Sequence, residues 1–341
     1  MQTIVLASAL TIAGGNVAAQ PPLDVQYVHD PFLWAVPTGM LFYHPNSSYR
    51  VSVAFPGNNT FEGCDYEYQG VSFDPQGDQI TPLGFTCFTL TGSYPIESMT
   101  DSGSGVGFIG DSWPVQEAML SLPGTIWNEP YTANCMGTPT GQGGVSAYGY
   151  PGTVVYATSE PGYSIRVVYR VDYPPPSQQW CVPVAHLFSK VLLHGDTVLA
   201  VGFPTVTRLD LSSGASLGEF DLYMGDSLNI GEATISGDTL FWAAQFGGAQ
   251  LQVGAYRMGQ GPLWSTTLPF MHHPVGLAVD GHGHLWTAVN DQLIWLDRST
   301  GTWSSTNYAT EFKDLKGWHD DLFLFGLSGS QAFLMYAKAT P

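Results

Sequence analysis

Short apolar runs, separated by turns that contain Gly or Asp, recur along the chain from about residue 150 onward. Each repeat consists of such a turn, an apolar strand, a polar break, and a second strand that leads into a turn and an aromatic residue. Runs of four to eight apolar residues between turn residues are typical of β-strands. The first strand of the repeat appears at residues 152–155, 195–199, 237–241, 283–286 and 320–323.

The repeats have a nearly constant length. The aligned residues Val154, Val198, Leu240, Leu285 and Leu322 follow one another at steps of 44, 42, 45 and 37 in the numbering. The second part of the repeat recurs in step, and its turns at residues 209–214 and 296–301 are near copies. In these turns Asp can accept hydrogen bonds from backbone amides, and Gly can supply the positive φ that closes the turn.

A period near 42–45 residues fits one four-stranded antiparallel sheet, which cannot bury both faces alone and must stack on its neighbours around an axis. The sequence therefore predicts an all-β fold, a single β-propeller of about seven blades, with six to eight allowed. The repeats are clear in residues 151–341.

Residues 20–150 keep the composition but blur the period. The step from Val106 to Val154 is 48 in the numbering, and the step from Leu41 to Val106 is 65. We expect irregular blades here, with an insertion held by two cysteines, or a separate β-domain.

Residues 275–286, which read VGLAVD and then GHGHLW, resemble the repeat unit of NHL-type and SMP-30/gluconolactonase-like six-bladed propellers. The two Leu-Asp turns are similar to those of quinoprotein-like repeats. The resemblance covers about residues 165–341 and implies the fold, because many unrelated activities share such units. The lactonases carry a metal-binding Asp in a Pro-Asp-Gly step, and Val275 stands at the matching position here. Valine cannot ligate a divalent cation, so the resemblance does not carry that activity over.

The chain is acidic, with a formal charge of −18 from 10 basic and 28 acidic residues. Such a field repels phosphate backbones and argues against nucleic acid as a partner. Acidic chains can also be disordered, but the 13% aromatic content favours a packed core.

Residues 1–19 are predicted to be a signal peptide, with an apolar stretch from Ile4 to Ala13 and cleavage before Gln20. The stretch lacks a preceding Lys or Arg, so a buried first strand or a mis-assigned start codon stays open as an alternative. No later run approaches the ~18 apolar residues that span a bilayer. The mature chain is therefore expected to be soluble and without a membrane span, and to be extracellular, periplasmic or at the cell surface.

Four cysteines occur, all in the first part of the chain and without a Cys-x-x-Cys pair: Cys64, Cys87, Cys135 and Cys181. In a secreted chain they predict two disulfides, for which three pairings exist. Neighbours along a meandering sheet are usually neighbours in space, which favours Cys64 with Cys87 and Cys135 with Cys181.

Ten tryptophans raise the question of a binding surface, since exposed rings can stack on sugars. Those on the repeat are expected to pack blade against blade, namely Trp242, Trp264, Trp286, Trp295 and Trp303. Those off the repeat are the candidate binding residues, namely Trp34, Trp113, Trp127 and Trp318.

A loose group of histidines is the candidate metal site, formed by His282, His284 and His319. The first two share a face if their segment is extended. The alternative is a hairpin tip whose histidines contact water. No catalytic residue is predicted: residues 225–228 spell the Gly-Asp-Ser-Leu block of a hydrolase family, but no late Asp-x-x-His completes its proton relay.

Strong repeats without a complete catalytic set favour a secreted bacterial-type propeller, a non-enzymatic, monomeric module that binds a protein or carbohydrate ligand. One alternative is a metal-dependent lactonase, lyase or hydrolase at the propeller's axial mouth. Another is a sensor or cell-surface scaffold propeller from a larger chain. No cofactor is predicted, and calcium or another divalent metal stays open.

Overall fold

The computed structural model describes residues 23–29, 40–43, 51–56, 66–74, 79–88, 96–101, 106–110, 117–121, 125–129, 133–135, 138–140, 144–150, 153–159, 166–172, 177–186, 188–202, 204–223, 231–246, 250–308, 310–318, 321–328 and 331–339. Side chains are described chiefly from residue 177 onward. Strands are the regular elements of these ranges, and they form antiparallel sheets. None of these residues lies in a helix long and apolar enough to cross a membrane. The predicted signal peptide at residues 1–19 lies outside the described ranges.

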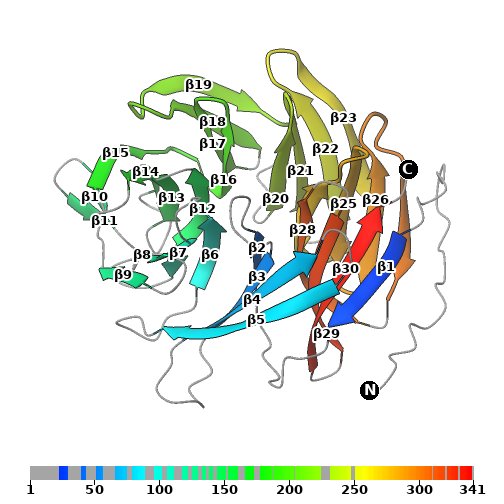
Figure 1. Cartoon of the computed structure of the whole chain (residues 1–341). Helices are drawn as coiled ribbons and strands as arrows, with labels where there is room; N and C mark the ends of the chain where they lie inside the picture. Colours follow the sequence, from blue (N-terminus) through cyan, green and yellow to red (C-terminus); the bar gives the residue numbers. More distant parts are fainter. Residues whose placement is uncertain are drawn as a thin grey trace. The chain divides into compact units, whose positions relative to one another are not determined.

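The chain divides into two compact units, of which one spans Phe42–Gly225. Its described residues form four four-stranded sheets, each a meander of sequence neighbours (Figure 1). Their strands are β2 (Met40–Tyr43), β3 (Val51–Pro56), β4 (Tyr66–Asp74) and β5 (Gln79–Phe88); β6 (Ile96–Asp101), β7 (Val106–Gly110), β8 (Glu117–Ser121) and β9 (Thr125–Glu129); β12 (Gly144–Tyr150), β13 (Thr153–Ser159), β14 (Arg166–Asp172) and β15 (Ser177–Pro183); and β16 (Phe188–His194), β17 (Thr197–Gly202), β18 (Thr205–Asp210) and β19 (Ser216–Asp221). A two-stranded sheet of β10 (Ala133–Cys135) and β11 (Thr138–Thr140) completes it.

The other unit comprises Met1–Leu41 and Asp226–Pro341, and its described residues form three four-stranded sheets. Their strands are β20 (Gly231–Ser236), β21 (Thr239–Phe246), β22 (Gln250–Arg257) and β23 (Gly261–Leu268); β24 (Leu277–Val279), β25 (His284–Val289), β26 (Gln292–Asp297) and β27 (Trp303–Asn307); and β28 (Glu311–Trp318), β29 (Asp321–Ser328), β30 (Gln331–Ala339) and β1 (Leu23–His29).

The last of these sheets is closed by the first strand of the chain. β1 pairs antiparallel with β30, from Leu23 opposite Ala339 to His29 opposite Leu334 (Figure 1). Residues from both ends of the sequence thus share one sheet. No local pattern in the sequence indicates this pairing.

The predicted repeat matches the strands. The five aligned apolar residues, Val154, Val198, Leu240, Leu285 and Leu322, all lie at the start of the second strand of a sheet. Each pairs with a third-strand residue of its own sheet, namely Val171, Leu209, Tyr256, Leu296 and Ala337. The repeat is therefore confirmed at the level of register as well as length.

The irregular spacing near the N-terminus has a simple cause. Val106 begins a second strand, β7, whereas Leu41 lies in a first strand, β2. The residue equivalent to Val106 is Val51, at the start of β3. Measured from Val51, the step to Val106 is shorter than the step measured from Leu41. Within residues 40–129, the part that the structure describes forms two four-stranded meanders like those of the later repeats.

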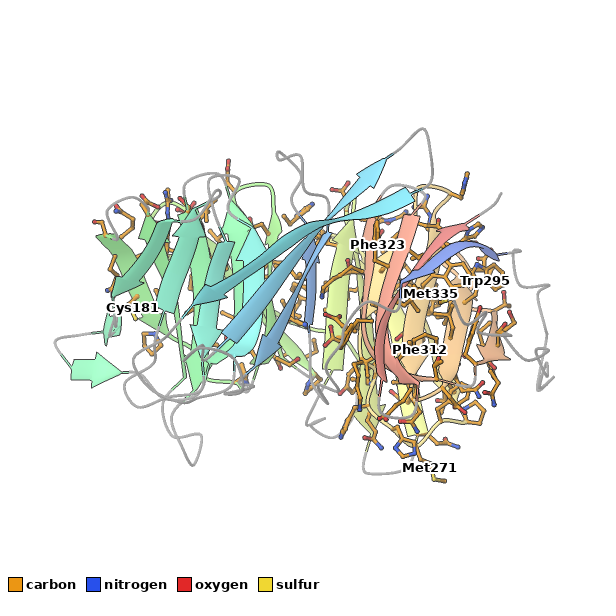
Figure 2. All side chains as sticks on the ribbon, turned by 60° about the horizontal axis from the view of Figure 1, so that its bottom comes forward. Cys181, Met271, Trp295, Phe312, Phe323 and Met335 are labelled. Atoms are coloured by element: carbon orange, nitrogen blue, oxygen red, sulfur yellow. The ribbon has the colours of Figure 1, made fainter. Side chains whose placement is uncertain are left out.

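Each unit buries its core between neighbouring sheets. In the second strands almost every described residue is buried, whereas β19, a fourth strand, is exposed along most of its length. One apolar cluster joins β12–β15 to β16–β19 and includes Val155 and Leu209. In the other unit, Trp295 and Phe312 belong to a cluster shared by two adjacent sheets (Figure 2). First strands of adjacent sheets contact one another in turn, as in β20 with β24 and β24 with β28.

Cys181 in β15 is disulfide-bonded. β10, which carries Cys135, contacts β15. Cys64 and the side chains of Cys87 and Cys135 lie outside the described residues, so the two pairings stay predictions.

Candidate functional site

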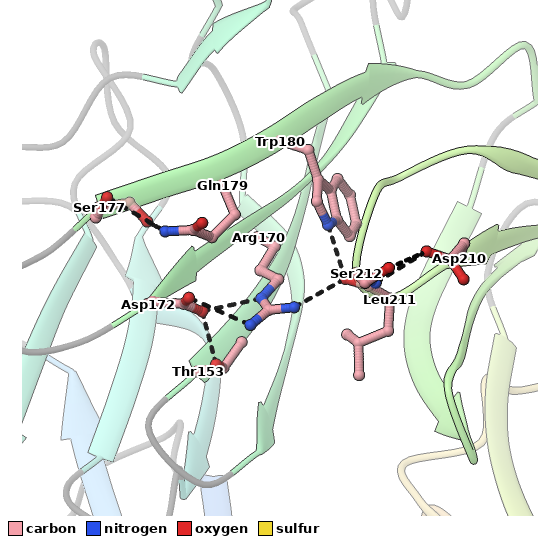
Figure 3. Close-up of polar contacts among 9 residues, drawn as sticks. All are labelled: Thr153, Arg170, Asp172, Ser177, Gln179, Trp180, Asp210, Leu211 and Ser212. Atoms are coloured by element: carbon pink, nitrogen blue, oxygen red, sulfur yellow. Dashed lines mark hydrogen bonds and ion pairs between the residues drawn. The ribbon is translucent and has the colours of Figure 1, made fainter.

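A tryptophan from one sheet docks on a turn of the next in the Phe42–Gly225 unit (Figure 3). Trp180 in β15 donates from Nε1 to the Leu211 carbonyl, at 2.8 Å. Arg170 donates to the same carbonyl at 3.0 Å and pairs with Asp172 at 2.9 Å. Gly214, with φ of 70°, lies under the indole, where a Cβ would come within 2.8 Å of the ring. Only glycine fits both the backbone angle and the ring.

The same contact recurs in the other unit. Trp264 in β23 donates to the Arg298 carbonyl at 2.8 Å, and a Cβ on Gly301 would lie 2.5 Å from its ring. Gly301 has φ of 71°. The packing role predicted for Trp264 is confirmed, and Trp242, Trp286 and Trp295 are buried in the core.

An Asp holds each of these turns in shape. Asp210 Oδ1 accepts from the backbone amide of Ser213 at 2.8 Å and of Ser212 at 3.1 Å. Hydrogen bonds from the Ser212 and Ser213 side chains, with these amides, lower the pKa of Asp210 to about 2. Asp297 makes the same contacts in its turn, and they lower its pKa although desolvation opposes them. The turn chemistry predicted from the sequence is confirmed.

The predicted aromatic binding residues fall largely beyond the description. Trp34 and Trp113 lie outside the described residues. Trp127 belongs to β9 and Trp318 to β28, but their side chains are also outside the description. A binding role for these four residues stays a prediction.

A buried carboxylate organises the turn between β24 and β25. Asp280, whose side chain has no exposed surface, accepts from the backbone amide of His284 at 2.8 Å and contacts His284 Nδ1 at 2.9 Å. It also accepts from Trp286 Nε1 at 2.8 Å. Three hydrogen-bonding contacts therefore converge on one buried carboxyl group, as expected for a polar group without exposed surface. The sequence offers Asp280 and the Gly-rich turn after it, but not this convergence.

His282 and His284 lie close together, with ring centroids 6.1 Å apart. His319 lies outside the described residues, so the structure does not place the predicted third ligand. Among the side chains that are described, no three from His, Cys, Asp and Glu converge as around a closed metal centre.

Charged groups also meet on the first strands of the Asp226–Pro341 unit. Lys316 Nζ in β28 lies 3.4 Å from Asp314 Oδ1. Desolvation opposes the charge of Lys316, but the charges of Asp314 and of Glu232 in β20 outweigh it, so the pKa of Lys316 is raised. The register of β28 shifts between Phe312 and Asp314, and such a bulge redirects side chains.

The connection from β23 to β24, residues 269–274, is named here the Met271 loop. Met271 is 65% exposed and projects from the ribbon (Figure 2), and His272 and His273 beside it are also exposed. Phe270 is half-buried against Trp303, with ring centroids 5.8 Å apart. Gln245 donates to the Met271 carbonyl at 2.7 Å, which ties the loop to β21.

No protein-family model matches the sequence, and no curated protein is similar to it. Solved structures are similar in fold. Hydrazine synthase from Kuenenia stuttgartiensis superposes with a TM-score of 0.63 at 12% identity, over 89% of this chain and 96% of that one. The fold is a β-propeller. The Pan2 WD40 domain from Neurospora crassa gives a TM-score of 0.61 at 10% identity, over 95% of this chain and 98% of that one.

At these identities the likeness concerns the propeller fold alone. It does not single out the NHL, SMP-30 or quinoprotein-like repeats that the sequence resembles, and that finer assignment stays a prediction. The described residues form seven four-stranded sheets. The blade count itself stays a prediction.

Sequence reasoning missed two functional candidates in this propeller. Met271 lies in a connection whose exposure depends on how the blades pack, and no local pattern reveals that. Glu232 and Lys316 come from blades two apart in the chain order, and their strands, β20 and β28, both contact the first strand of the intervening blade, β24.

Proposed function

We propose that this chain is a secreted, non-enzymatic propeller that binds a protein through the Met271 loop. The exposed side chain of Met271 is the observation that carries this proposal. Methionine is flexible and polarizable, and it is frequent on surfaces that accommodate a protein partner. At 65% exposure, it has apolar surface left to bury against a partner.

The loop is held in place before any partner arrives. The Phe270 carbonyl accepts from Leu251 N at 2.9 Å, and Val275 N donates to the Ala288 carbonyl at 3.0 Å. With the Gln245 bond, these contacts fix both ends of the loop to β-strands. A loop that is already ordered loses little conformational entropy on binding.

The same loop favours a protein over a glycan. Sugars stack on flat aromatic faces, and the aromatic ring of this loop, Phe270, packs edge-on against Trp303. What the loop offers to a ligand is the thioether of Met271 with two imidazoles beside it. This combination suits an apolar knob on a protein surface.

Several charged side chains among the described residues form hydrogen bonds that stabilise turns or join blades. This also favours binding over catalysis. Asp280 is occupied by three donors, and Asp210 and Asp297 hold turns. Arg170 spans two blades.

The test compares Met271→Glu with Leu263→Glu, a matched control on β23 that is 42% exposed. The mature protein would be used to capture partners from the cell surface and the culture medium. Each purified partner's Kd for the wild type and for both variants would then be measured by biolayer interferometry. Burial of a Met side chain contributes about 1.5–3 kcal/mol to the binding free energy. Met271→Glu should therefore raise the Kd about 10- to 100-fold, and Leu263→Glu should leave the Kd unchanged. Equal effects in both variants, or binding of a glycan that ignores Met271, would refute the proposal.

An enzymatic alternative rests on Lys316 of β28 and the two acidic residues near it, Asp314 and Glu232. Lys316 keeps its positive charge between Asp314 and Glu232, and such a group can stabilise a developing oxyanion. If the chain were a hydrolase or lyase acting there, turnover of a lactone and ester panel would be lost in Lys316→Met. Turnover that survives this substitution would exclude the cluster as the site.

A further inference from the structure

We propose that the turn between β24 and β25 binds one divalent transition-metal ion, of the Zn²⁺ and Cu²⁺ class, through His284 and His282. Asp280 is the positioning residue that holds His284 ready. This site is separate from the Met271 loop and does not depend on it.

His284 presents one defined nitrogen. Its Nδ1 lies 2.9 Å from Asp280 Oδ2, and a carboxylate oxygen accepts hydrogen bonds, so Nδ1 is used in this contact and Nε2 is the ring nitrogen left for a ligand. Histidines that ligate metals typically donate their other ring N–H to a carboxylate in this way, which fixes the tautomer and raises the basicity of the ligand.

The ring is also fixed in orientation. It meets Trp286 edge to face at 6.5 Å and Trp295 at 5.8 Å, while Asp280 is locked by Trp286 and by the backbone of the turn. His284 nevertheless keeps 19% of its side chain exposed. A rigid, partly exposed imidazole loses little freedom when it takes up an ion.

His282 stands at a suitable distance to be the second ligand. Its ring centroid is 6.1 Å from that of His284. With metal–nitrogen bonds of about 2.0–2.1 Å, two imidazoles on one ion have centroids about 5–6 Å apart. Because His282 is exposed, a small rotation of its side chain is enough to close the difference.

The donor set selects the ion. Two imidazole nitrogens suit Zn²⁺, Cu²⁺ and Ni²⁺, whereas Ca²⁺ and Mg²⁺ require oxygen ligands. Water completes the coordination, since no third described side chain of a suitable type converges there. The Arg298 guanidinium packs against Gly283 and places a positive charge nearby. The buried charge of Asp280 and the overall charge of −18 oppose that repulsion.

The experiment uses the mature, tag-free protein after dialysis against EDTA. Titration with Zn²⁺ by calorimetry should show one saturable site, and Cu²⁺ added to the same protein should give an EPR spectrum with nitrogen hyperfine splitting. His282→Ala and His284→Ala should each weaken binding at least about 10-fold. Asp280→Asn should weaken it about 10- to 100-fold, because the carboxylate that orients the His284 ring is lost.

The matched control is His186→Ala, which removes an exposed histidine of the Phe42–Gly225 unit and should leave the affinity unchanged. His282 is exposed and its alanine variant is expected to fold, so this variant decides the matter if Asp280→Asn does not fold. Two results would overturn the proposal: no saturable Zn²⁺ binding below about 1 mM, or binding that survives His282→Ala and His284→Ala.

Discussion

The glycine beneath each docked tryptophan gives the sharpest stability prediction. In Gly301→Ala, the new Cβ has to adopt φ of 71° and would lie 2.5 Å from the Trp264 ring. The indole cannot move away freely, because its Nε1 is bonded to the Arg298 carbonyl. The backbone angle costs roughly 1–2 kcal/mol and the overpacking roughly 1–3 kcal/mol, so we expect the free energy of unfolding to fall by about 2–5 kcal/mol.

Two other glycines separate these contributions. Gly237 has φ of 58° and open space around its Cβ position, so Gly237→Ala should cost only the backbone part. Gly254 has no positive φ, but its Cβ would lie 2.5 Å from the Trp242 ring, so Gly254→Ala should cost only the overpacking.

The assay is equilibrium unfolding in urea, followed by tryptophan fluorescence and by far-UV circular dichroism. The two signals have to coincide before a free energy is extracted. The reasoning is refuted if Gly301→Ala costs no more than Gly237→Ala, because the indole would then not constrain the turn.

Two further predictions concern a charge and a strand. Asp210 has its pKa lowered to about 2, so its contribution to stability is complete above the unfolded-state pKa of about 3.9 and is lost as the pH falls toward 2. Unfolding measured from pH 6 to pH 2 should therefore show a shallower loss of stability in Asp210→Ala than in the wild type, and parallel profiles would contradict the turn assignment. Removing residues 23–29 should lower Tm by at least about 10 °C, because β30 loses its ladder partner. Scanning calorimetry beside a variant lacking only residues 20–22 checks this, and an equal Tm would show that β1 adds nothing to the sheet.

The repeat was predictable because its chemistry is local. Val198 and Leu240 each lie three residues after the Gly of a turn. Asp210 and Asp297 are each followed within four residues by Ser and Gly, which indicates a turn. Leu41 lies in a first strand and is not equivalent to Val106, which lies in a second strand. The two kinds of strand look alike in the sequence because both are short and apolar. Hydrophobic pattern does not distinguish the order of strands within a sheet.

Contacts between distant segments were not predictable in this way. β1 and β30 are separated by residues 30–330, and each reads as an ordinary strand. Asp280 was visible as part of a Gly-rich turn, but its three donors depend on how β25 lies against that turn. The exposure of Met271 depends on blade packing, which a sequence pattern does not encode.

The pairing of β1 with β30 has a consequence for how the chain is made. At about 5–20 residues per second, the ribosome needs roughly 15–60 s to add the residues between the two strands. During that time β1 has no strand to pair with, and the last sheet is incomplete. The sheet of β28, β29, β30 and β1 can therefore be completed only after synthesis reaches β30, and we expect the unpaired N-terminal strand to be the segment on which a holding chaperone acts.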